Sequence, residues 1–282
     1  MLRHVIGRNK AWLQRKVREQ REPSRLISAV ITDINGTVDT AVFGSPLDLD
    51  HIIKIRDLIA LVGKDPAIPR LCFNTGWDVN YTLLYAQMLG APAHHVIERG
   101  AAVVSLDGPF IRETMDPRIT AAMIREIAQV QMAFIAEHPR HYENLQLGKK
   151  YSMSFQFEMG SKEKERCLSD VKSFIASRGM ELDIEEGPNF FNVGFPDIDK
   201  GTGATMLVAM LEGVDFSSTC GIGDSDGDWT YMSKCGFTAC PSNASRFLRE
   251  RCDYVATKPE TEGTLEILER IVQWNITMIG GS

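Results

Sequence analysis

Three apolar runs that each end in acidic or small polar residues constrain the fold of this chain more than any other feature. They cover residues 26–33, 68–75 and 218–225, and the first is nearly continuous up to a terminal aspartate. Such runs are typical of strands buried on both faces of a parallel sheet. Helical patterns lie between them, over residues 47–62 and 203–212. The repeated order of strand, polar end and helix predicts an α/β fold with a doubly wound, mainly parallel sheet.

The middle of the chain departs from this order. Residues 117–137 place apolar side chains three or four positions apart, which predicts an amphipathic helix, and a second helical pattern follows later. Between the two patterns, residues 151–159 alternate strictly between apolar and polar, which predicts a strand buried on one face only in an antiparallel sheet. We therefore expect an α+β cap domain over residues 116–192, inserted into a core made of residues 26–115 and 193–282.

Composition excludes several classes of protein. The 282 residues are 44% hydrophobic and 24% charged with a net charge of −6, so the chain has ample apolar material for a core and is not expected to be disordered. No run approaches eighteen apolar residues, and no apolar leader opens the chain. We therefore expect no integral membrane segment, no secretory signal and a cytoplasmic location.

Residues 1–25 form a basic extension. They hold eight Lys and Arg residues against Glu19 and Glu22, a net charge of +6, so the rest of the chain carries −12. An acidic body argues against a nucleic acid partner, because a phosphate backbone requires a basic surface. The apolar spacing within residues 2–25 predicts an amphipathic helix, which is either a surface helix packed on the acidic body or a targeting or membrane-contacting segment.

Chemically active side chains follow the predicted strands or begin the predicted helices. They occur in DINGT (33–37), NTG (74–76), DKG (199–201) and GDSDGD (223–228). In a doubly wound sheet, ligands bind at the carboxyl ends of the strands, where these segments converge. Carboxylates hold a hard cation, a lysine and a hydroxyl orient phosphoryl oxygens, and a carboxylate can attack phosphorus. The set predicts a magnesium-dependent phosphoryl-transfer site.

The order of these motifs carries a family resemblance. DINGTV, FNTGW, DKGTGATMLVAML, GIGDSDGDWTYM and CPSNASRFLRERCDYVATKPETEG resemble motifs of the haloacid dehalogenase-like (HAD) superfamily of phosphohydrolases. The likeness covers residues 26–282 and is to the Cof-type and sucrose-phosphatase-like branch, which includes mannosyl-3-phosphoglycerate phosphatases. VIERGAAVVSLDG (96–108) is similar to the strand and hairpin that precede the cap in that branch. The resemblance implies a Rossmannoid core, an inserted α+β cap, an aspartyl-phosphate intermediate and Mg²⁺ as cofactor.

The resemblance also assigns roles to individual residues. The implied catalytic residues are Asp33 as the nucleophile, Asn35 and Lys200. The implied phosphate-binding residues are Thr75, Gly76, Lys200 and Gly36. The implied metal ligands are Asp33, Asn35 through its backbone carbonyl, Asp224 and Asp228, with Asp228 either a direct ligand or the group that orders the water around the metal.

Asn35 departs from the family pattern, in which the phosphatases have an aspartate two residues after the nucleophile. That aspartate protonates the leaving alcohol and then activates water, and an amide can do neither, so turnover is expected to fall by ~10²–10⁴. Three explanations stay open. Asn35 is an engineered replacement that traps an intermediate; it is native in an enzyme whose leaving group needs no proton, such as an acyl phosphate; or the chain binds a phosphorylated ligand without turnover.

The sequence thus favours a phosphatase of a small phosphorylated metabolite, a sugar phosphate or a phosphoglycerate-like acid. A catalytically silent relative that binds a phosphorylated ligand and a phosphomutase are the alternatives, and a homodimer stays open.

Trp77 and Trp229 either wall the pocket or pack in the core. The cap is expected to select the substrate through exposed polar side chains. The candidates are His141, Tyr142, Ser152, Ser154, Gln156 and Asn192.

Overall fold

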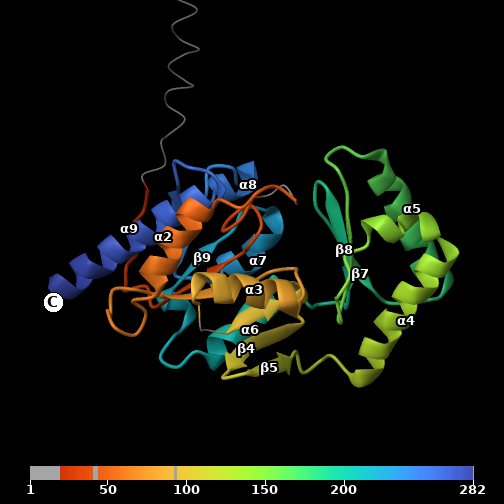
Figure 1. Cartoon of the computed structure of the whole chain (residues 1–282), viewed down its shortest axis with the longest axis horizontal. Helices are drawn as coiled ribbons and strands as arrows, with labels where there is room; N and C mark the ends of the chain where they lie inside the picture. Colours follow the sequence, from red (N-terminus) through yellow and green to blue (C-terminus); the bar gives the residue numbers. More distant parts are fainter. Residues whose placement is uncertain (1–19, 41–43, 92–93, 282) are drawn as a thin grey trace, which may run out of the picture.

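The computed structural model describes residues 20–40, 44–91 and 94–281, and a five-stranded sheet forms its centre (Figure 1). The strands pair in the order β11-β10-β9-β1-β2, and every pair is parallel. Their bounds are β1 Ala29–Thr32, β2 Arg70–Phe73, β9 Thr219–Ile222, β10 Phe237–Cys240 and β11 Tyr254–Val255. The three predicted strands are β1, β2 and β9, and the predicted α/β fold with a mainly parallel sheet is confirmed.

Helices cover both faces of the central sheet, because alternate side chains of a strand point to opposite faces. Val30 packs in one cluster with three helices, α2 Leu49–Ile59, α3 Val79–Leu89 and α9 Glu260–Gly280. Ala29 and Ile31 pack in a second cluster with α6 Lys200–Met210, α7 Trp229–Met232 and α8 Arg246–Arg249. With both faces covered, the carboxyl ends of the strands become the place where a ligand can approach.

A three-stranded antiparallel sheet extends the core. Its strands pair in the order β3 His95–Ile97, β4 Ala102–Asp107 and β5 Phe110–Met115. β3 lies beside the end of β2, where Asn74 and Val96 form a parallel bridge. The short 3-10 turn η1 Glu98–Gly100 joins β3 to β4, and the N–H of Arg99 donates to the carbonyl of Thr75 at 3.0 Å. This sheet therefore connects the end of β2 to the inserted segment.

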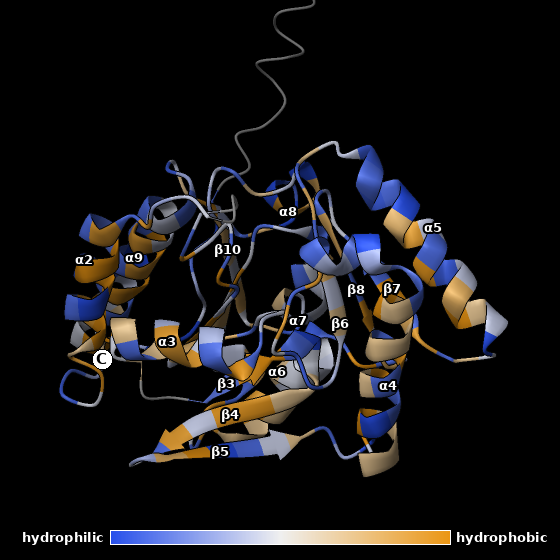
Figure 2. Cartoon of the chain, turned by 45° about the vertical axis from the view of Figure 1, so that its right-hand side comes forward, coloured by the Kyte–Doolittle hydropathy of each residue, from blue (hydrophilic) through white to orange (hydrophobic). Residues whose placement is uncertain are grey.

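The inserted segment has its own antiparallel sheet, with strands β6 Met153–Gln156, β8 Phe190–Gly194 and β7 Asp183–Glu186 in that order. Helices α4 Ala121–Glu137 and α5 Lys162–Ser177 lie on the side of this sheet that faces away from the core (Figures 1 and 2). The remaining short 3-10 turns are η2 Pro139–Asn144, η3 Phe216–Ser218 and η4 Asp226–Asp228. The division at residues 116 and 192 stays a prediction, and β8 runs across the second boundary.

The prediction that the strand within residues 151–159 is buried on one face only is wrong. Met153 and Phe155 pack in a hydrophobic cluster with the two helices, as expected. Ser152 and Ser154 alternate with them and are also buried, with 3% and 0% exposure. The hydroxyl of Ser152 donates to Glu98 of the core at 2.9 Å. Polar side chains are buried here because the core covers this face and supplies their hydrogen-bond partners.

The predicted N-terminal helix over residues 2–25 falls mostly on residues 1–19, which lie outside the described residues. Residues 20–25 are not helical, and the N–H of Arg21 donates to the carbonyl of Asp253 at 3.0 Å. Within the described ranges, none of the helices combines the length and the apolar character that a membrane span requires.

Candidate active site

Four segments that are far apart in the sequence meet at the carboxyl end of the central sheet. Asp33 directly follows β1, and its N–H donates to the carbonyl of Ile222 in β9 at 3.1 Å. Asp224 therefore lies beside it, two residues beyond the end of β9. Asn74 follows β2 on the other side of β1, and its Nδ2 donates to the carbonyl of Lys200 at 2.8 Å. This bond holds the first turn of α6 against the same edge of the sheet.

Lys200 joins two carboxylates in the buried centre of the site. Its Nζ lies 2.9 Å from Oδ2 of Asp33 and 2.7 Å from Oδ1 of Asp228. Burial raises the pKa of Asp33 to about 6, although the charge of Lys200 opposes the rise. Burial alone would lower the pKa of Lys200, but the charges of Asp228 and Asp33 raise it above its ordinary value. The ammonium group is therefore held in its charged form between the two acids.

Asp224 completes a cluster of three carboxylates with Asp33 and Asp228. One oxygen from each residue lies within 4.8 Å of the others. Burial raises the pKa of Asp224 well above its ordinary value, and the charges of Asp228 and Asp33 raise it further. Gly36 lies against this carboxylate, because a Cβ at position 36 would be 2.2 Å from Oδ2 of Asp224. The φ of Gly36, +72°, also favours glycine, so any side chain here would displace Asp224.

Asp228 is fully engaged by the protein. Its Oδ1 accepts from Lys200, and its Oδ2 accepts from the N–H of Asp224 at 3.1 Å and from the N–H of Ser225 at 2.9 Å. The hydroxyl of Ser225 donates to the same oxygen at 2.9 Å. These contacts fix the loop that carries Asp224 and the position of Lys200 together.

Thr75 and Gly76 form the turn that follows β2. Thr75 is 1% exposed, its N–H donates to the carbonyl of Val96 at 3.2 Å, and its Oγ1 accepts from the N–H of Trp77 at 3.3 Å. The structure thus places this turn at the same sheet edge as the carboxylates. Lys200 contacts the acids directly. Thr75 and Gly76 lie near the site only because they follow β2 at the same sheet edge.

Asn35 is held by two aromatic side chains. Nε1 of Trp77 donates to Oδ1 of Asn35, and Nδ2 of Asn35 donates to the hydroxyl of Tyr81 at 3.4 Å. The two rings are stacked, with centroids 4.1 Å apart. The hydroxyl of Tyr81 donates in turn to Oδ2 of Asp39 at 3.3 Å, so it accepts from Asn35. Residue 35 is therefore bound through both the acceptor and the donor of an amide.

Sequence reasoning missed two residues that contact the site loops. Nδ2 of Asn243 donates to the carbonyl of Gly36 at 2.9 Å, and Oδ1 of Asn243 accepts from the N–H of Glu260 at 2.8 Å. Asn243 lies in the CPSNASRF motif, which was a usable signal. Nζ of Lys149 donates to the carbonyl of Gly76 at 2.9 Å. Lys149 lies in a polar stretch without a pattern, so only the folded structure reveals this contact.

The structure separates the two tryptophans beside the motifs. Trp77 contacts Asn35, whereas Trp229 packs edge-to-face on Phe247, with ring centroids 6.1 Å apart. Trp77 therefore lines the site, and Trp229 belongs to the core.

The side chains predicted to select the substrate from the cap differ in their exposure. The expectation that they are exposed holds for Tyr142 but is wrong for His141, Ser152, Ser154 and Asn192, which are buried. The hydroxyl of Ser154 donates to Oδ1 of Asn192 at 2.5 Å on the face that meets the core. Gln156 is half-buried and accepts from Gln146 at 3.2 Å.

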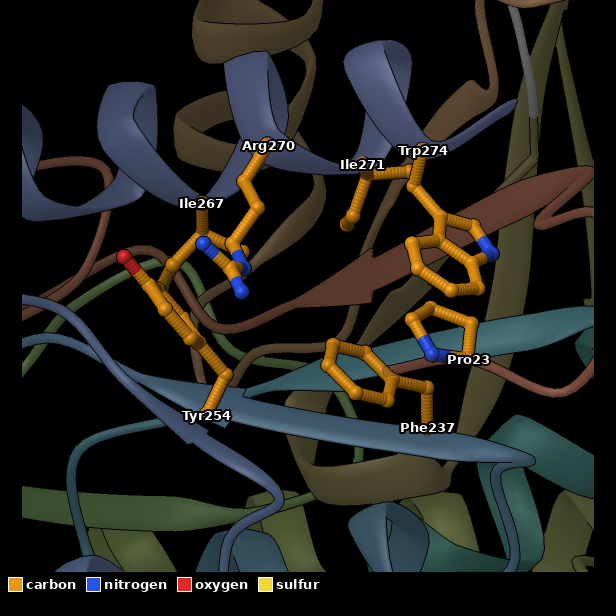
Figure 3. Close-up of a pocket in the computed structure, with 7 residues that line it drawn as sticks. All are labelled: Pro23, Phe237, Tyr254, Ile267, Arg270, Ile271 and Trp274. Carbon is orange, nitrogen blue, oxygen red and sulfur yellow. The ribbon is translucent and has the colours of Figure 1, made fainter. Parts of the chain in front are cut away.

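Two other features lie outside this cluster. A small apolar pocket lies between α9 and β10 and is lined by Pro23, Phe237, Tyr254, Ile267, Arg270, Ile271 and Trp274 (Figure 3). His138 at the C-terminal end of α4, His141 in η2 and Asp170 in α5 also lie together. Arg140 already binds Oδ2 of Asp170 at 2.5 Å, so this oxygen has a cationic partner. Neither feature contains the paired carboxylates and lysine that phosphoryl transfer requires.

Sequence comparison places the cluster in a family. The profile of the haloacid dehalogenase-like hydrolases matches residues 125–268, just over half of the chain. The phosphoglycolate phosphatase of Methanothermobacter thermautotrophicus is 21% identical over 246 residues, which are 87% of this chain and 99% of that protein. The phosphoglycolate phosphatase of Staphylothermus marinus is 24% identical over 180 residues, 60% of this chain and 74% of that protein.

Solved structures share the fold. A protein of Thermoplasma acidophilum has a TM-score of 0.64 and 17% identity, covering 88% of this chain and 99% of that one. The sucrose-phosphatase of Synechocystis, solved with sucrose and phosphate, has a TM-score of 0.57 and 12% identity, covering 88% of this chain and 98% of its own. The profile match and the shared fold confirm the resemblance predicted from the motifs, and the chain belongs to the haloacid dehalogenase-like hydrolase family.

Proposed function

We propose that the protein is a Mg²⁺-dependent phosphatase that hydrolyses a small phosphorylated metabolite through an aspartyl-phosphate on Asp33. One observation carries the proposal: Nζ of Lys200 contacts both Asp33 and Asp228, beside the third carboxylate of Asp224. The names of similar proteins agree with it, since two relatives are phosphoglycolate phosphatases and a structural neighbour is a sucrose-phosphatase.

The donor set fits a hard divalent cation. Asp33, Asp224 and Asp228 offer only carboxylate oxygens, which Mg²⁺ prefers. Three carboxylates and one lysine also leave a net negative charge at a buried place, which a bound cation offsets. We assign Asp33, Asp224 and the backbone carbonyl of Asn35 as ligands. Asp228 positions Lys200 and the loop, because both of its oxygens accept hydrogen bonds from the protein. Bound Mg²⁺ would supply charge stabilisation for the phosphoryl oxygens.

The residues of the chain account for the bond changes. Lys200 holds the carboxylate of Asp33, which forms a bond to phosphorus while the bond from phosphorus to the leaving oxygen breaks. Lys200, the hydroxyl of Thr75 and the N–H of Gly76 bind the transferred phosphoryl oxygens. Water then attacks phosphorus, which restores the carboxylate and releases phosphate. The leaving oxygen takes its proton from solvent, because the amide of Asn35 has none to give.

The contacts of Asn35 help to choose among the three explanations for an asparagine at this position. Trp77 donates to its oxygen and Tyr81 accepts from its nitrogen, so the surroundings match an amide. This match favours asparagine as the resident residue over an engineered replacement. A resident asparagine suits an enzyme whose leaving group needs no proton. It also favours the second candidate function, a catalytically silent protein that binds a phosphorylated ligand.

We also propose that residues 116–192 act as a cap over the site. The support is that this segment reaches the site loops, through Lys149 at the carbonyl of Gly76 and through Glu185, whose Oε2 lies 2.6 Å from Nε of Arg99. A cap in this place would exclude water and present its own side chains to the leaving group. A cytoplasmic location and a homodimer stay predictions from the sequence.

Phosphate release separates the two candidate functions. The chain as given and the Asn35→Asp variant are assayed with phosphoglycolate, sugar phosphates and an acyl phosphate, with Mg²⁺ and with a chelator. The proposal expects phosphate release that requires Mg²⁺ and is fastest in Asn35→Asp, while an Asp33→Asn sample prepared in parallel reports contaminating phosphatases. Binding of a phosphorylated compound without release by either form would establish the silent binder instead.

A further inference from the structure

Lys149 lies where the cap meets the site loops. Its Nζ donates to the carbonyl of Gly76, which follows Thr75, and to the hydroxyl of Ser154 in β6. The same nitrogen lies 5.9 Å from the centroid of the Trp77 ring. Trp77 in turn donates to Asn35, two residues from the proposed nucleophile. Lys149 is therefore separated from the reacting region by one aromatic side chain.

The charge of Lys149 has no ionic partner in the part of the chain that the structure describes. The other cations of this region are paired, Lys200 with Asp33 at 2.9 Å and Arg99 with Glu185 at 2.6 Å. Both oxygens that accept from Lys149 are neutral. Lys149 is half-buried, and placing an ammonium group partly out of water with no carboxylate in contact costs free energy. Burial lowers the pKa of Lys149 to about 8, although the charges of nearby carboxylates that do not contact it oppose the fall.

A row of polar side chains across the cap sheet fixes the position of this ammonium group. Ser154, Asn192 and Glu185 are neighbours in register on β6, β8 and β7. Ser154 accepts from Lys149 and donates to Asn192, and Nδ2 of Asn192 donates to Oε2 of Glu185 at 3.0 Å. Glu185 also binds Arg99. Each side chain of the row thus has a hydrogen-bond or ionic partner, and these contacts hold Nζ of Lys149 in place before any ligand binds.

The polar row touches loops on both sides of the carboxylate cluster. A Cβ at Gly76, in the turn after β2, would lie 4.0 Å from Nδ2 of Asn192. A Cβ at Gly227, next to Asp228, would lie 2.7 Å from Oε1 of Glu185. A ligand whose phosphoryl group reaches Asp33 therefore has its opposite end directed toward this face of the cap.

We propose that Lys149 binds a carboxylate at the end of the substrate remote from phosphorus, so that the substrate class is a small phosphorylated carboxylic acid. This inference rests on the proposed function of the site. A single negative charge matches the one ammonium group that no carboxylate contacts among the described residues of this region, whereas a second phosphate would place additional charge beside Glu185 and Glu98. The ring of Trp77 limits the space around the same nitrogen and adds a cation–π contact.

The test compares two substrates of similar length, phosphoglycolate with a carboxylate end and ethyl phosphate with a neutral end. We expect the full chain to prefer phosphoglycolate. Lys149→Met should reduce this preference by ~10- to 150-fold, the range for a hydrogen bond to a charged group. The loss should appear in KM rather than in kcat, and Lys149→Arg should restore part of it. Lys150→Met is the matched control, because Lys150 is exposed and pairs with Glu113 at 3.0 Å.

Equilibrium binding by calorimetry keeps this inference separate from the proposed function. If neither compound releases phosphate but phosphoglycolate binds more tightly and loses that advantage in Lys149→Met, the subsite stands and the phosphatase proposal fails. If phosphate is released but the preference is the same in Lys149→Met and in the full chain, the subsite is refuted and the phosphatase proposal stands. Equal binding of the two compounds to the unmodified chain also refutes the subsite.

Discussion

Lys200 in the core and Lys149 in the proposed cap segment both contact residues of the site loops, and their surroundings differ in charge. Lys200 lies 2.9 Å and 2.7 Å from two carboxylates, and its pKa is raised. Lys149 donates to two neutral oxygens, and burial lowers its pKa to about 8. The core thus places two carboxylates in contact with its lysine, whereas none of the described carboxylates contacts Lys149. On the proposed function, this difference suits a core that carries out the reaction and a cap segment that receives an incoming anion.

The largest effect is expected from the core side of this comparison. Asp33→Asn removes the proposed nucleophile and one partner of Lys200, and phosphate release should fall by at least ~10⁴-fold, as losses of an enzyme nucleophile do. Steady-state phosphate release with Mg²⁺ present measures it. A residual rate within tenfold of the unmodified chain would mean that another group attacks phosphorus.

Asn35→Asp should change turnover in the opposite direction. A carboxyl at position 35 can protonate the leaving group and activate water, so kcat for an alkyl phosphate should rise by ~10²–10⁴. An acyl phosphate, whose leaving group needs no proton, should gain much less. Asn35→Ser is the control, because it changes the contacts with Trp77 and Tyr81 without supplying an acid. An equal gain for both substrate types would contradict the assignment.

Metal binding tests whether the three-carboxylate cluster of the core carries an excess of negative charge. At a Mg²⁺ concentration of 100 times Kd, the free energy of unfolding should rise by about 2.7 kcal/mol. Asp224→Asn should abolish most of this Mg²⁺-dependent rise, measured by denaturant titration. Asp226→Asn is the matched control in the same loop, because Asp226 is exposed and is not one of the three carboxylates of the cluster. Equal responses of the two variants would remove Asp224 from the metal site.

The smallest expected effect is the pH dependence of the cap subsite. The folded pKa of Lys149 is lowered to about 8, so the ammonium form that binds a carboxylate predominates below pH 8 and is lost above it. The preference for phosphoglycolate over ethyl phosphate should therefore fall by up to about tenfold per pH unit above the pKa of the free protein, and should level off once the uncharged lysine carries all of the binding. The charged groups that act on Lys149 from neighbouring elements are Glu98, Asp78, Arg99 and Glu185.

Lys149→Arg is the control for the pH measurement, because arginine stays protonated across this range. Its preference should be flat where that of the unmodified chain falls. Parallel declines in the two proteins would assign the pH dependence to another group.

Three strands of the core and the acidic residues at their ends could be predicted from the sequence, because each depends on neighbouring residues, whereas β10 and β11 were not predicted. A buried parallel strand requires a short apolar run, and β1, β2 and β9 all lie within the predicted runs. Helix α6 begins three residues before its predicted start, at Lys200, because the side chain of Asp199 accepts from the N–H of Thr202 at 2.8 Å. The roles of Asp33, Lys200, Asp224 and Asp228 stay predictions, but the structure places these residues together.

The sequence by itself determined three of the five strands of the central sheet and the acidic residues that follow them, since local hydrophobicity and order suffice for that. Only the tertiary structure decided that Trp77 holds the amide of Asn35, that Ser154 is buried, and that none of the carboxylates in the described ranges contacts Lys149. These properties depend on partners that lie tens of residues away in the chain. Burial and the balance of charge around a side chain arise only when distant segments pack together, and no local pattern records them.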